Sequence, residues 1–302
     1  MKITLVRSMS RSAVFELVND SCYRAPAPYT ITLDGAAVCS GDTNVFSLYS
    51  LEPAHTYTLA VTLDGGTNTL TFTTAEESCF VDASRYGLVA DGVTDNTAKL
   101  QAALSTCPAG GTVYLPAGTY RTQSLFLQSN TTLYLEKGCT LLGGTDRHDY
   151  PILPGVLPCH NEKDEQYLAL WEGNPLDSFA ALINVINAEN VTITGEGTLD
   201  CNAQNGDWYQ NPKEKNIAWR PRLFFTSGAK NVVLHGVLVC NSYSWTIHPT
   251  YSENVDILNI RIRNSSQSPN TDGIDPESCE YTRIIGVNIH VGDDCIAMKA
   301  SK

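Results

Sequence analysis

Apolar and polar residues alternate along four short segments in the first quarter of the chain, at positions 29–35, 44–51, 55–65 and 67–74. Asp-Gly and Gly-Gly pairs, which favour tight turns, occur between some of these segments. Alternation with a period of two places the apolar side chains on one face of a β-strand. The pattern therefore predicts that residues 1–77 form a small β-sandwich with half-buried strands.

A different pattern begins after residue 77. Four apolar residues follow the helical spacing i, i+3, i+4 and i+7: Leu100, Ala103, Leu104 and Cys107. This spacing predicts a short helix with one apolar face. Asp95 or Asn96 can cap its first turn, and Pro108 ends it. The segment 112–120, "TVYLPAGTY", then predicts a strand with a tight turn.

A motif of Asn followed by Val and Ile residues recurs in the second half of the chain. It starts at Asn190, Asn231 and Asn254, and in degenerate form at Tyr281. The last two separations between successive copies of the motif are each about 25 residues, which is typical of one coil of a solenoid. The first separation is longer and leaves room for one coil with an insertion or for two short coils. The Leu-x-x-Leu-x-Leu pattern of leucine-rich repeats is absent. We therefore expect a parallel β-helix over residues 78–302, with the helix at 97–107 covering its first coil.

Charge and composition restrict the partners of the protein. The chain has 302 residues, with 20 basic and 32 acidic side chains and a net charge of -12, which argues against a nucleic-acid partner. The sequence has no apolar stretch long enough for a membrane helix and no apolar run of the kind found in signal peptides. This predicts a cytoplasmic protein without a membrane partner, although secretion stays open as an alternative.

Ten cysteines are spread singly along the chain, without any Cys-x-x-Cys pair. Zinc clusters usually need such pairs, so no metal or other cofactor is expected from the cysteines. An even number of cysteines permits disulfides, but small buried thiols in a reducing compartment are favoured for a chain of this size.

Three carboxylates are candidates for catalysis. Asp272 precedes the pair Asp293-Asp294 by close to one coil of a β-helix, so we expect the three side chains to meet on one surface. Crowding separates the pKa values of neighbouring carboxyl groups, so one can act as an acid while another stays a base. Glycoside hydrolysis requires this division. A calcium site or a simple Asp-Gly turn is the alternative from spacing alone.

The surrounding sequence resembles glycoside hydrolase family 28, the polygalacturonases and their relatives. The resemblance rests on "NTDGID" at 270–275, "GDDCIAMK" at 292–299 and "SWTIHPTYSENVDILNIRIRN" at 244–264, and the segment from 86 to 120 is similar to the entry segment of these β-helices. It implies a right-handed parallel β-helix and an inverting glycosidase. The implied substrates are galacturonate-containing pectic oligosaccharides, with no cofactor.

The resemblance also implies roles for individual residues. Asp293 would be the general acid, and Asp272 with Asp294 would position and deprotonate the attacking water. The implied substrate-binding residues are Lys299, Asn270, His248 and Arg222. Inverting carboxyl groups generally lie about 6.5–9.5 Å apart, whereas stacking in adjacent coils predicts nearer 5 Å. The family's downstream Gly-His-Gly and Arg-x-Lys motifs are not in the 302 residues, so the resemblance predicts a β-helix domain that is incomplete at its C-terminus and has impaired activity.

Other features leave alternatives open. The segment 51–61, "LEPAHTYTLAV", resembles a strand region of fibronectin type III modules, so the sandwich is expected to be of that type. Four tryptophans could stack on sugars or pack in the core: Trp171, Trp208, Trp219 and Trp245. Insertions at 144–180 and 201–222 could close one end of a groove and favour exo action. A calcium-dependent pectate-lyase-like enzyme and a noncatalytic carbohydrate-binding β-helix are the competing functions.

Overall fold

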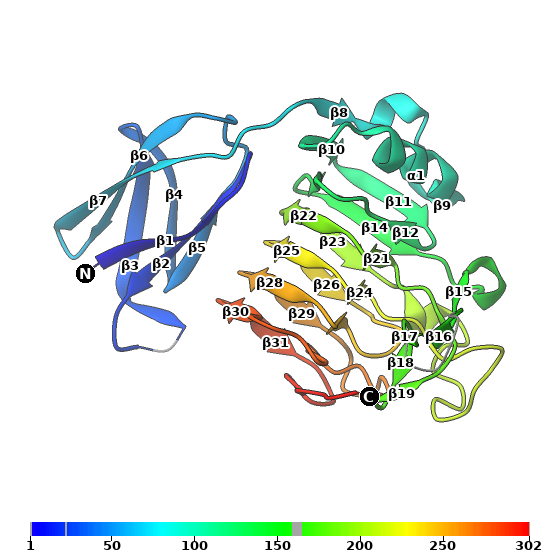
Figure 1. Ribbon diagram of the computed structural model, residues 1–302. Coiled ribbons are helices and arrows are strands. Elements are labelled where there is room, and N and C mark those ends of the chain that lie inside the picture. Colours follow the sequence, from blue (N-terminus) through cyan, green and yellow to red (C-terminus); the bar gives the residue numbers. More distant parts are fainter. Residues whose placement is uncertain (1, 22, 159–164, 302) are drawn as a thin grey trace.

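The computed structural model describes residues 2–21, 23–158 and 165–301. The first part of the chain forms two antiparallel sheets that face each other (Figure 1). One sheet has the order β1-β2-β5, and the other has the order β4-β3-β6-β7. The strands are β1 (Lys2–Ser8), β2 (Ala13–Val18), β3 (Arg24–Leu33), β4 (Ala36–Thr43), β5 (Val45–Leu48), β6 (Thr56–Leu63) and β7 (Gly66–Thr73).

The sequence pattern identified four of these strands and missed β1, β2 and β4. Strand β2 does not alternate because both of its faces are buried: Phe15 points into the sandwich core, whereas Val14 packs outside it against the rest of the protein. Strand β4 is almost wholly exposed, so it lacks the apolar residues that mark a half-buried strand.

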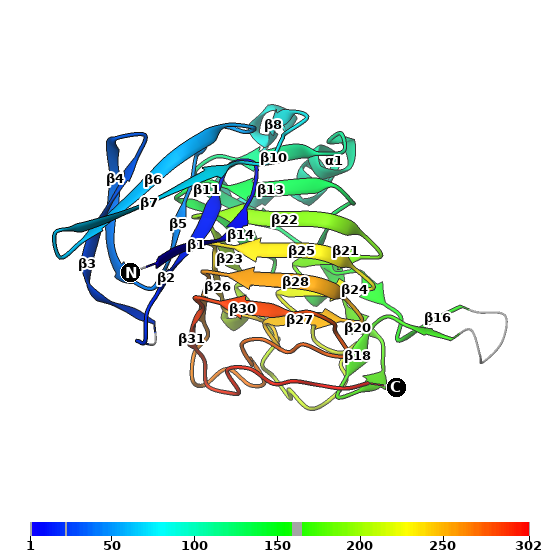
Figure 2. The same ribbon diagram turned by 60° about the vertical axis from the view of Figure 1, so that its left-hand side comes forward.

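From β8 (Phe80–Asp82) onward most strands pair in parallel, and these parallel strands form three sheets around one apolar core (Figures 1 and 2). This arrangement is a parallel β-helix. The first sheet contains β8, β10 (Gly111–Leu115), β13 (Thr131–Leu135), β22 (Glu189–Gly195), β25 (Lys230–His235), β28 (Glu253–Leu258) and β30 (Arg283–Ile285). The second contains β9 (Asp91–Asp95), β11 (Gly118–Thr122), β14 (Cys139–Gly143), β23 (Thr198–Asp200), β26 (Leu238–Cys240), β29 (Arg261–Arg263) and β31 (Asn288–His290).

The third sheet is shorter and carries the candidate site. It contains β12 (Leu125–Phe126), β21 (Ile183–Ile186), β24 (Phe224–Ser227) and β27 (Ile247–Thr250). Single parallel bridges continue it beyond β27, because Ile247 pairs with Ile274 and Ile274 pairs with Ile296. Isoleucines therefore stack once per coil, at a spacing close to the coil length expected from the sequence repeat. Ile247 and Ile274 are buried, whereas Ile296 in the last coil is exposed.

The copies of the repeated Asn motif form neighbouring strands of the first sheet, as expected for one copy in each coil. Strands β22, β25 and β28 are neighbours, with Val191 opposite Val232 and Val232 opposite Val255. Asn190, Asn231 and Asn254 have φ angles of 56°, 54° and 56°, in the left-handed region that Asn tolerates better than most residues. Their amides also form a ladder of hydrogen bonds from coil to coil, 3.0 and 3.2 Å long.

The predicted helix is present as α1 (Thr97–Thr106), and it buries Leu100, Ala103 and Leu104. Its N-terminus differs in detail from the expectation. The Asp95 carboxylate accepts the hydrogen bond from the Thr97 backbone at 2.8 Å, while the Asn96 side chain bonds the backbone of Val89 instead. Among the residues that the structure describes, no helix has the length and apolar character needed to cross a bilayer.

The insertion after β14 forms three small antiparallel hairpins on the outer face of the third sheet (Figure 2). They pair β15 (Ile152–Leu153) with β20 (Ser178–Phe179), β16 (Val156–Leu157) with β17 (Gln166–Tyr167), and β18 (Leu170–Trp171) with β19 (Asn174–Pro175). Leu168 and Ala181 pack with Phe225 of β24 in a second, small apolar cluster. Short 3-10 helices occur at Ala83–Tyr86, Arg147–Asp149 and Ala203–Asn205.

The second insertion, after β23, buries a tryptophan. Trp208 has no exposed surface and packs edge-on against Tyr150 and Phe179, beneath the guanidinium of Arg147. Of the two alternatives left open for Trp208, sugar stacking or core packing, the structure shows core packing. A bulky indole anchors this loop to the core because the loop has little regular secondary structure to stabilise it.

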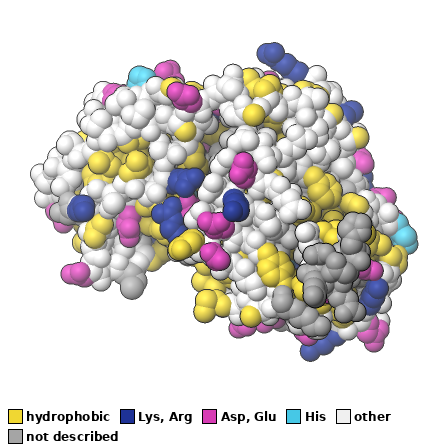
Figure 3. Space-filling view, in the orientation of Figure 1, with side chains coloured by type: hydrophobic (Ala, Val, Ile, Leu, Met, Phe, Trp, Pro, Cys, Tyr) yellow, Lys and Arg dark blue, Asp and Glu magenta, His cyan; other side chains and the backbone are white. Residues whose placement is uncertain are grey.

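The sandwich packs against the outer face of the first sheet of the β-helix. Val14 and Val45 of the sandwich form a buried apolar cluster with Val233 of β25 and Leu258 of β28. Charged side chains gather along the hollow between the two parts (Figure 3), and one groove of about 450 Å³ there is lined by Lys137, Glu196 and Arg261, among others. Arg261 therefore lies on the second sheet beside the sandwich.

A buried histidine is part of this interface. His235 of β25 lies 2.7 Å from the Thr194 hydroxyl and 2.8 Å from the Ser47 hydroxyl, and its ring stacks on Tyr49. Burial lowers the pKa of His235 to about 3. The interface therefore contains a neutral imidazole in a layer of hydroxyl groups.

Acidification should destabilise the protein partly through His235. Its pKa is about 6.5 in an unfolded chain and lower in the folded protein. The neutral ring therefore contributes stability that is complete above pH 6.5 and is lost as the pH falls toward 3. We expect the free energy of unfolding to fall between pH 6.5 and 4.5 by about 1.4 kcal/mol per pH unit more in the wild type than in His235→Gln. Urea unfolding across this range measures the difference, and parallel curves would contradict it.

Candidate active site

The register of the third sheet brings the predicted carboxylates together. Ile274 pairs with Ile296, and the backbone N–H of Gly273 donates to the Asp294 carbonyl at 2.9 Å. Asp272 therefore lies beside the Asp293-Asp294 pair of the next coil. One carboxylate oxygen from each of the three aspartates lies within 4.8 Å of the others, so the expected clustering is present. Asp272 is buried, whereas Asp293 and Asp294 are exposed.

This spacing agrees with stacking in adjacent coils and is shorter than the range of about 6.5–9.5 Å general for inverting carboxyl groups. The distance of 4.8 Å is an upper limit for the separation between one oxygen of each carboxylate, whereas the general range is a separation between whole carboxyl groups.

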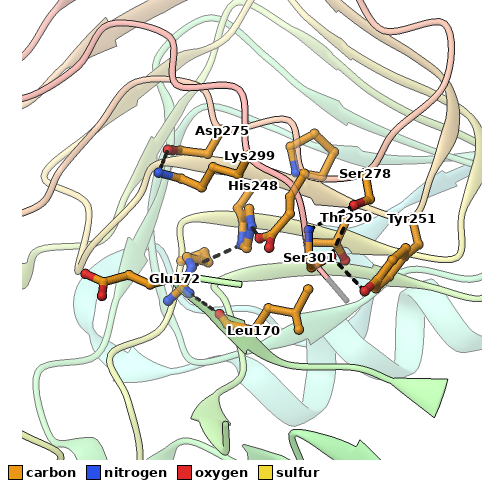
Figure 4. Close-up of polar contacts among 12 residues, drawn as sticks. Leu170, Glu172, His248, Thr250, Tyr251, Asp275, Ser278, Lys299 and Ser301 are labelled. Atoms are coloured by element: carbon orange, nitrogen blue, oxygen red, sulfur yellow. Dashed lines mark hydrogen bonds and ion pairs between the residues drawn. The ribbon is translucent and has the colours of Figure 1, made fainter. Parts of the chain in front are cut away.

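Lys299 is the cation of the cluster. Its ammonium lies 3.0 Å from Asp275 (Figure 4). It also lies 3.6 Å from Asp272 and 4.1 Å from the centre of the Trp245 ring. The sequence predicted Lys299 beside the aspartates. Clustered carboxylates can also bind a divalent cation, but an ammonium so close to Asp272 opposes a second positive charge.

The local charges alter the pKa values of the site. Burial, followed by the charge of Asp293, raises the pKa of Asp272, and Lys299 opposes this rise. Burial and then Asp272 raise the pKa of Asp275 to about 8. Burial alone would lower the pKa of Lys299, but Asp275 and Asp272 outweigh it, so the pKa is raised. At neutral pH, Asp275 therefore keeps its proton and Lys299 keeps its charge.

Asp275 and Glu277 were missed as functional residues at the sequence level. Both side chains are wholly buried. A signal was available, because the last step of the Asn repeat gives the coil length of this region. That length places Glu277 beside Thr250, and this pairing is observed. Glu277 also pairs with Lys299 in the next coil.

Asn270, predicted to bind substrate, lies at the edge of the site. Arg220 donates to its side-chain oxygen at 2.7 Å and to the Pro269 carbonyl at 2.9 Å, which fixes the segment that leads to Asp272. Asn270 also lines a pocket of about 310 Å³, and the other lining residues are Trp171, Glu172, Asn174, Leu176, Lys213 and Trp219. Burial lowers the pKa of Arg220 to about 10, which leaves it charged at neutral pH.

His248 and Arg222, the other two predicted substrate-binding residues, lie beneath the surface. They have 0% and 3% of their surface exposed, and they contact each other at 3.2 Å. The expectation of direct sugar contact by these side chains is therefore contradicted by their burial. The motif around His248 correctly indicated the neighbourhood but not the depth. Hairpin β18–β19 contacts Arg222 through the Leu170 carbonyl and the Trp171 ring, and His248 packs among Arg222, Glu277 and Trp245.

Three tryptophans stack in a row beside the site. Trp171 of the hairpin lies 4.6 Å from Trp219 and 5.0 Å from Trp245, with interplanar angles of 18° and 8°. Arg222 lies over both Trp171 and Trp245, at 4.8 and 4.5 Å. Since Trp171 has a neighbour on each side, it serves packing. Trp219 is half-exposed at the pocket, where it can contact a ligand.

The fold and the site define a class: parallel β-helix proteins with a carboxylate cluster suited to acid–base chemistry on one side wall. Residues 168–302 match the model of the glycosyl hydrolases family 28, which places this part of the chain in that family. The family predicted from the motifs is thereby confirmed. Residues 80–139 match the model described as "Rhamnogalacturonase A/epimerase, pectate lyase-like".

Individual relatives agree with this assignment. The chain is 35% identical over 222 residues to a "Probable polygalacturonase" of Vitis vinifera, covering 71% of this chain and 43% of the relative. An exopolygalacturonase structure from Thermotoga maritima is 28% identical, with a TM-score of 0.61 over 74% of this chain and 55% of that one. The Yersinia enterocolitica family 28 exopolygalacturonase shares the fold, with a TM-score of 0.72 and 21% identity over 98% of this chain and 64% of that one. The chain spans about half or less of the length of the curated relatives that it matches best.

The raised pKa of Asp275 gives a prediction about stability. Its pKa is about 8 in the folded protein and about 3.9 in an unfolded chain. Its protonated form therefore contributes stability that is complete below pH 4 and is lost as the pH rises toward 8. An asparagine at position 275 does not ionise, so Asp275→Asn does not lose this stability as the pH rises. We expect the variant to gain stability over the wild type between pH 5 and 8, by up to about 1.4 kcal/mol per pH unit.

Urea unfolding at several pH values tests this expectation. Asp64→Asn, in an exposed turn of the sandwich, is the matched control and should show no such trend. A stability difference for Asp275→Asn that does not change with pH would show that Asp275 is ionised when folded.

Proposed function

We propose that the protein is an inverting glycosidase that hydrolyses galacturonate-containing pectic oligosaccharides from one end. The cluster of Asp272, Asp293 and Asp294 beside Lys299 carries this proposal, in a chain of family 28. The cluster provides groups for acid and base catalysis, and the ammonium provides a positive charge for an acidic sugar. Relatives named as polygalacturonase and exopolygalacturonase support the substrate class.

Each aspartate has a role consistent with its position. Asp293 donates its proton to the glycosidic oxygen as the bond from this oxygen to the anomeric carbon breaks. Asp272 and Asp294 hold a water molecule and accept its proton as the water oxygen bonds to the anomeric carbon. Asp293 and Asp294 are accessible to substrate, and the charge of Lys299 favours the ionised form of Asp272, as a base requires.

Acidic sugars need local cations in a protein with a net charge of -12. Lys299 is at the cluster, and Lys213 with the exposed part of Trp219 lines the neighbouring pocket. A pyranose can stack on the indole while its carboxylate pairs with an ammonium group. Asn270, whose oxygen is held by Arg220, can donate its amide N–H groups to sugar oxygens.

The covering hairpin supports exo action. The tip of hairpin β18–β19 lies against the segment that carries Lys299: a Cβ on Gly173 would lie 3.1 Å from the Ala300 carbonyl oxygen. The hairpin thus forms a wall next to the carboxylates, and the 211–219 segment lines the same pocket. A wall at one end of a binding groove leaves room for a chain end rather than for a continuous polymer.

The finer features of the fold belong to this proposal as well. The division into a fibronectin type III-like sandwich at 1–77 and a right-handed β-helix at 78–302 is supported by the change from antiparallel to parallel pairing between β7 and β8. A sandwich of three and four strands in the order β1-β2-β5 and β4-β3-β6-β7 is consistent with that module. Cytoplasmic location stays a prediction.

Product analysis tests the activity. Incubation with oligogalacturonates of defined length should release monomer or dimer from one end, without the ultraviolet absorbance of unsaturated sugars and without loss of rate in a chelator. Unsaturated products or calcium dependence would establish a lyase instead. Tight binding without any product would leave a noncatalytic carbohydrate-binding protein.

Substitution of the aspartates tests their roles. Asp293→Asn, Asp272→Asn and Asp294→Asn should each lower kcat by about 10² to 10⁴, since each removes a proton-transferring or water-orienting group. The matched control is Asp64→Asn, which should keep full activity. Circular dichroism checks that the variants fold. Retained activity in any of the three would remove that residue from the mechanism.

A further inference from the structure

A chain of buried polar groups runs directly beneath the candidate site. Arg222 donates from Nε to Nδ1 of His248 at 3.2 Å, and Nε2 of His248 lies 2.7 Å from the Glu277 carboxylate. The side chains of His248 and Glu277 are completely buried, and Arg222 is 3% exposed. We call these three residues the Arg222 network. Figure 4 shows His248 within this network, next to Lys299 and Asp275.

The hydrogen-bond chemistry fixes the state of His248. A guanidinium can only donate, so Nδ1 must accept from Arg222, and the proton of the neutral ring is on Nε2, which donates to Glu277. Burial lowers the pKa of His248 to about 4, although Glu277 opposes this. Burial also lowers the pKa of Arg222, to about 9, which leaves the guanidinium charged. A neutral imidazole therefore links a buried cation to a carboxylate.

Trp245 connects the network to Lys299. The edge of its indole meets His248 at 5.0 Å and 80°, and Arg222 lies 4.5 Å from the centre of the ring. The Lys299 ammonium lies 4.1 Å from the same centre. Lys299 is also tied by its backbone, because its N–H donates to the Pro276 carbonyl beside Glu277 at 2.9 Å.

The same network reaches the covering hairpin. Arg222 donates to the Leu170 carbonyl at 2.7 Å and lies over the adjacent Trp171 ring at 4.8 Å. Its remaining contacts are with the Arg220 carbonyl and the Ser244 hydroxyl, at 2.6 and 3.1 Å. One guanidinium thus joins the hairpin, the tryptophan row and the strand of the candidate site. A planar group with five donors is suited to this task in a way that lysine is not.

We propose that the Arg222 network, acting through Trp245, is a positioning device that places the Lys299 ammonium against Asp272 and Asp275. The role in the reaction rests on the proposed glycosidase function. Loss of His248 frees the indole of Trp245, and loss of Trp245 removes it. In either case the ammonium of Lys299 then moves away from the two carboxylates. The groups that face Lys299 are Asp272 and Asp275 above the network and Glu277, His248 and Arg222 within it, and Asp293 faces Asp272.

Displacement of Lys299 should change the pH dependence of catalysis in one direction, through the pKa of Asp272. Lys299 lowers the pKa of Asp272, whereas burial and Asp293 raise it. Displacement of Lys299 leaves the raising effects unopposed, so the base needs a higher pH to ionise. The acid limb of the kcat/KM profile should therefore move to higher pH when the network is broken. Packing damage alone lowers the folded fraction and leaves this limb in place.

Four variants separate these outcomes. His248→Phe removes both hydrogen bonds, and His248→Gln keeps a neutral acceptor and donor. Trp245→Phe removes most of the surface on which Lys299 rests, and it serves if His248→Phe does not fold. His235→Phe is the matched control, because His235 is also fully buried but lies at the sandwich interface.

Kinetics on an oligogalacturonate give the first readout. In His248→Phe and Trp245→Phe we expect the acid limb of the kcat/KM profile to move to higher pH by about half a pH unit to one pH unit. We also expect kcat at pH 5 to be lowered about tenfold or more. His248→Gln should restore most of the wild-type profile, and His235→Phe should keep it. An unchanged acid limb in folded His248→Phe and Trp245→Phe overturns the proposal.

Chemical labelling of Lys299 gives a second readout that does not depend on activity. Acetylation by acetic anhydride, followed by mass spectrometry of the Lys299 peptide, reports the fraction of neutral amine as a function of pH. The pKa of Lys299 is raised by Asp275 and Asp272, so displacement from them should lower it and accelerate labelling severalfold at pH 8. Labelling equal to that of the wild type in both folded variants overturns the positioning role, whether or not the protein hydrolyses any pectic substrate.

Discussion

The hydrogen-bonded stacking of each coil on the one before it is the constraint on which the rest of the structure depends. Parallel register converts a separation of one coil in sequence into adjacent positions in space, as the row of Ile247, Ile274 and Ile296 shows. The same register places Asp272 beside Asp294 and Glu277 beside Lys299. A change of a single residue in coil length would turn these side chains to the opposite face, so the site depends on the core beneath it.

The site beneath the surface is held by a balance of charges. Asp272 and Glu277 face Arg222 and Lys299, while Asp275 keeps its proton and His248 is neutral. Burial of unpaired charge is costly, so each cation has a carboxylate partner or an aromatic face. The tryptophans meet part of this requirement, because the face of an indole ring attracts a cation. A buried guanidinium or ammonium group therefore costs less free energy against an indole than in an aliphatic environment.

Sequence reasoning was most successful where local chemistry and periodicity agree. The Asn residues at 190, 231 and 254 predicted both the repeat and the corners, because few other side chains tolerate positive φ. The aspartate cluster followed from coil length. Burial depth could not be inferred in this way. Arg222 is covered by a hairpin from an earlier part of the chain, and His248 packs beside Arg222, so no local sequence pattern indicates their burial. The same holds for Trp208 and for strand β2, whose second buried face meets the β-helix.

The position of the sandwich alters how the solenoid should unfold. In a simple repeat protein each coil touches only its neighbours, so stability is a sum of nearest-neighbour terms and an end can fray independently. Here one rigid body contacts five strands of successive coils, through Tyr134 on β13, Thr194 on β22, His235 on β25, Asp256 on β28 and Ile285 on β30. Arg283 of β30 reinforces the contact at Asp256 by donating to both oxygens of its carboxylate, at 2.6 and 2.5 Å. The sandwich thereby adds coupling between coils that do not touch each other, so a one-dimensional array gains the all-or-none unfolding of a globular domain.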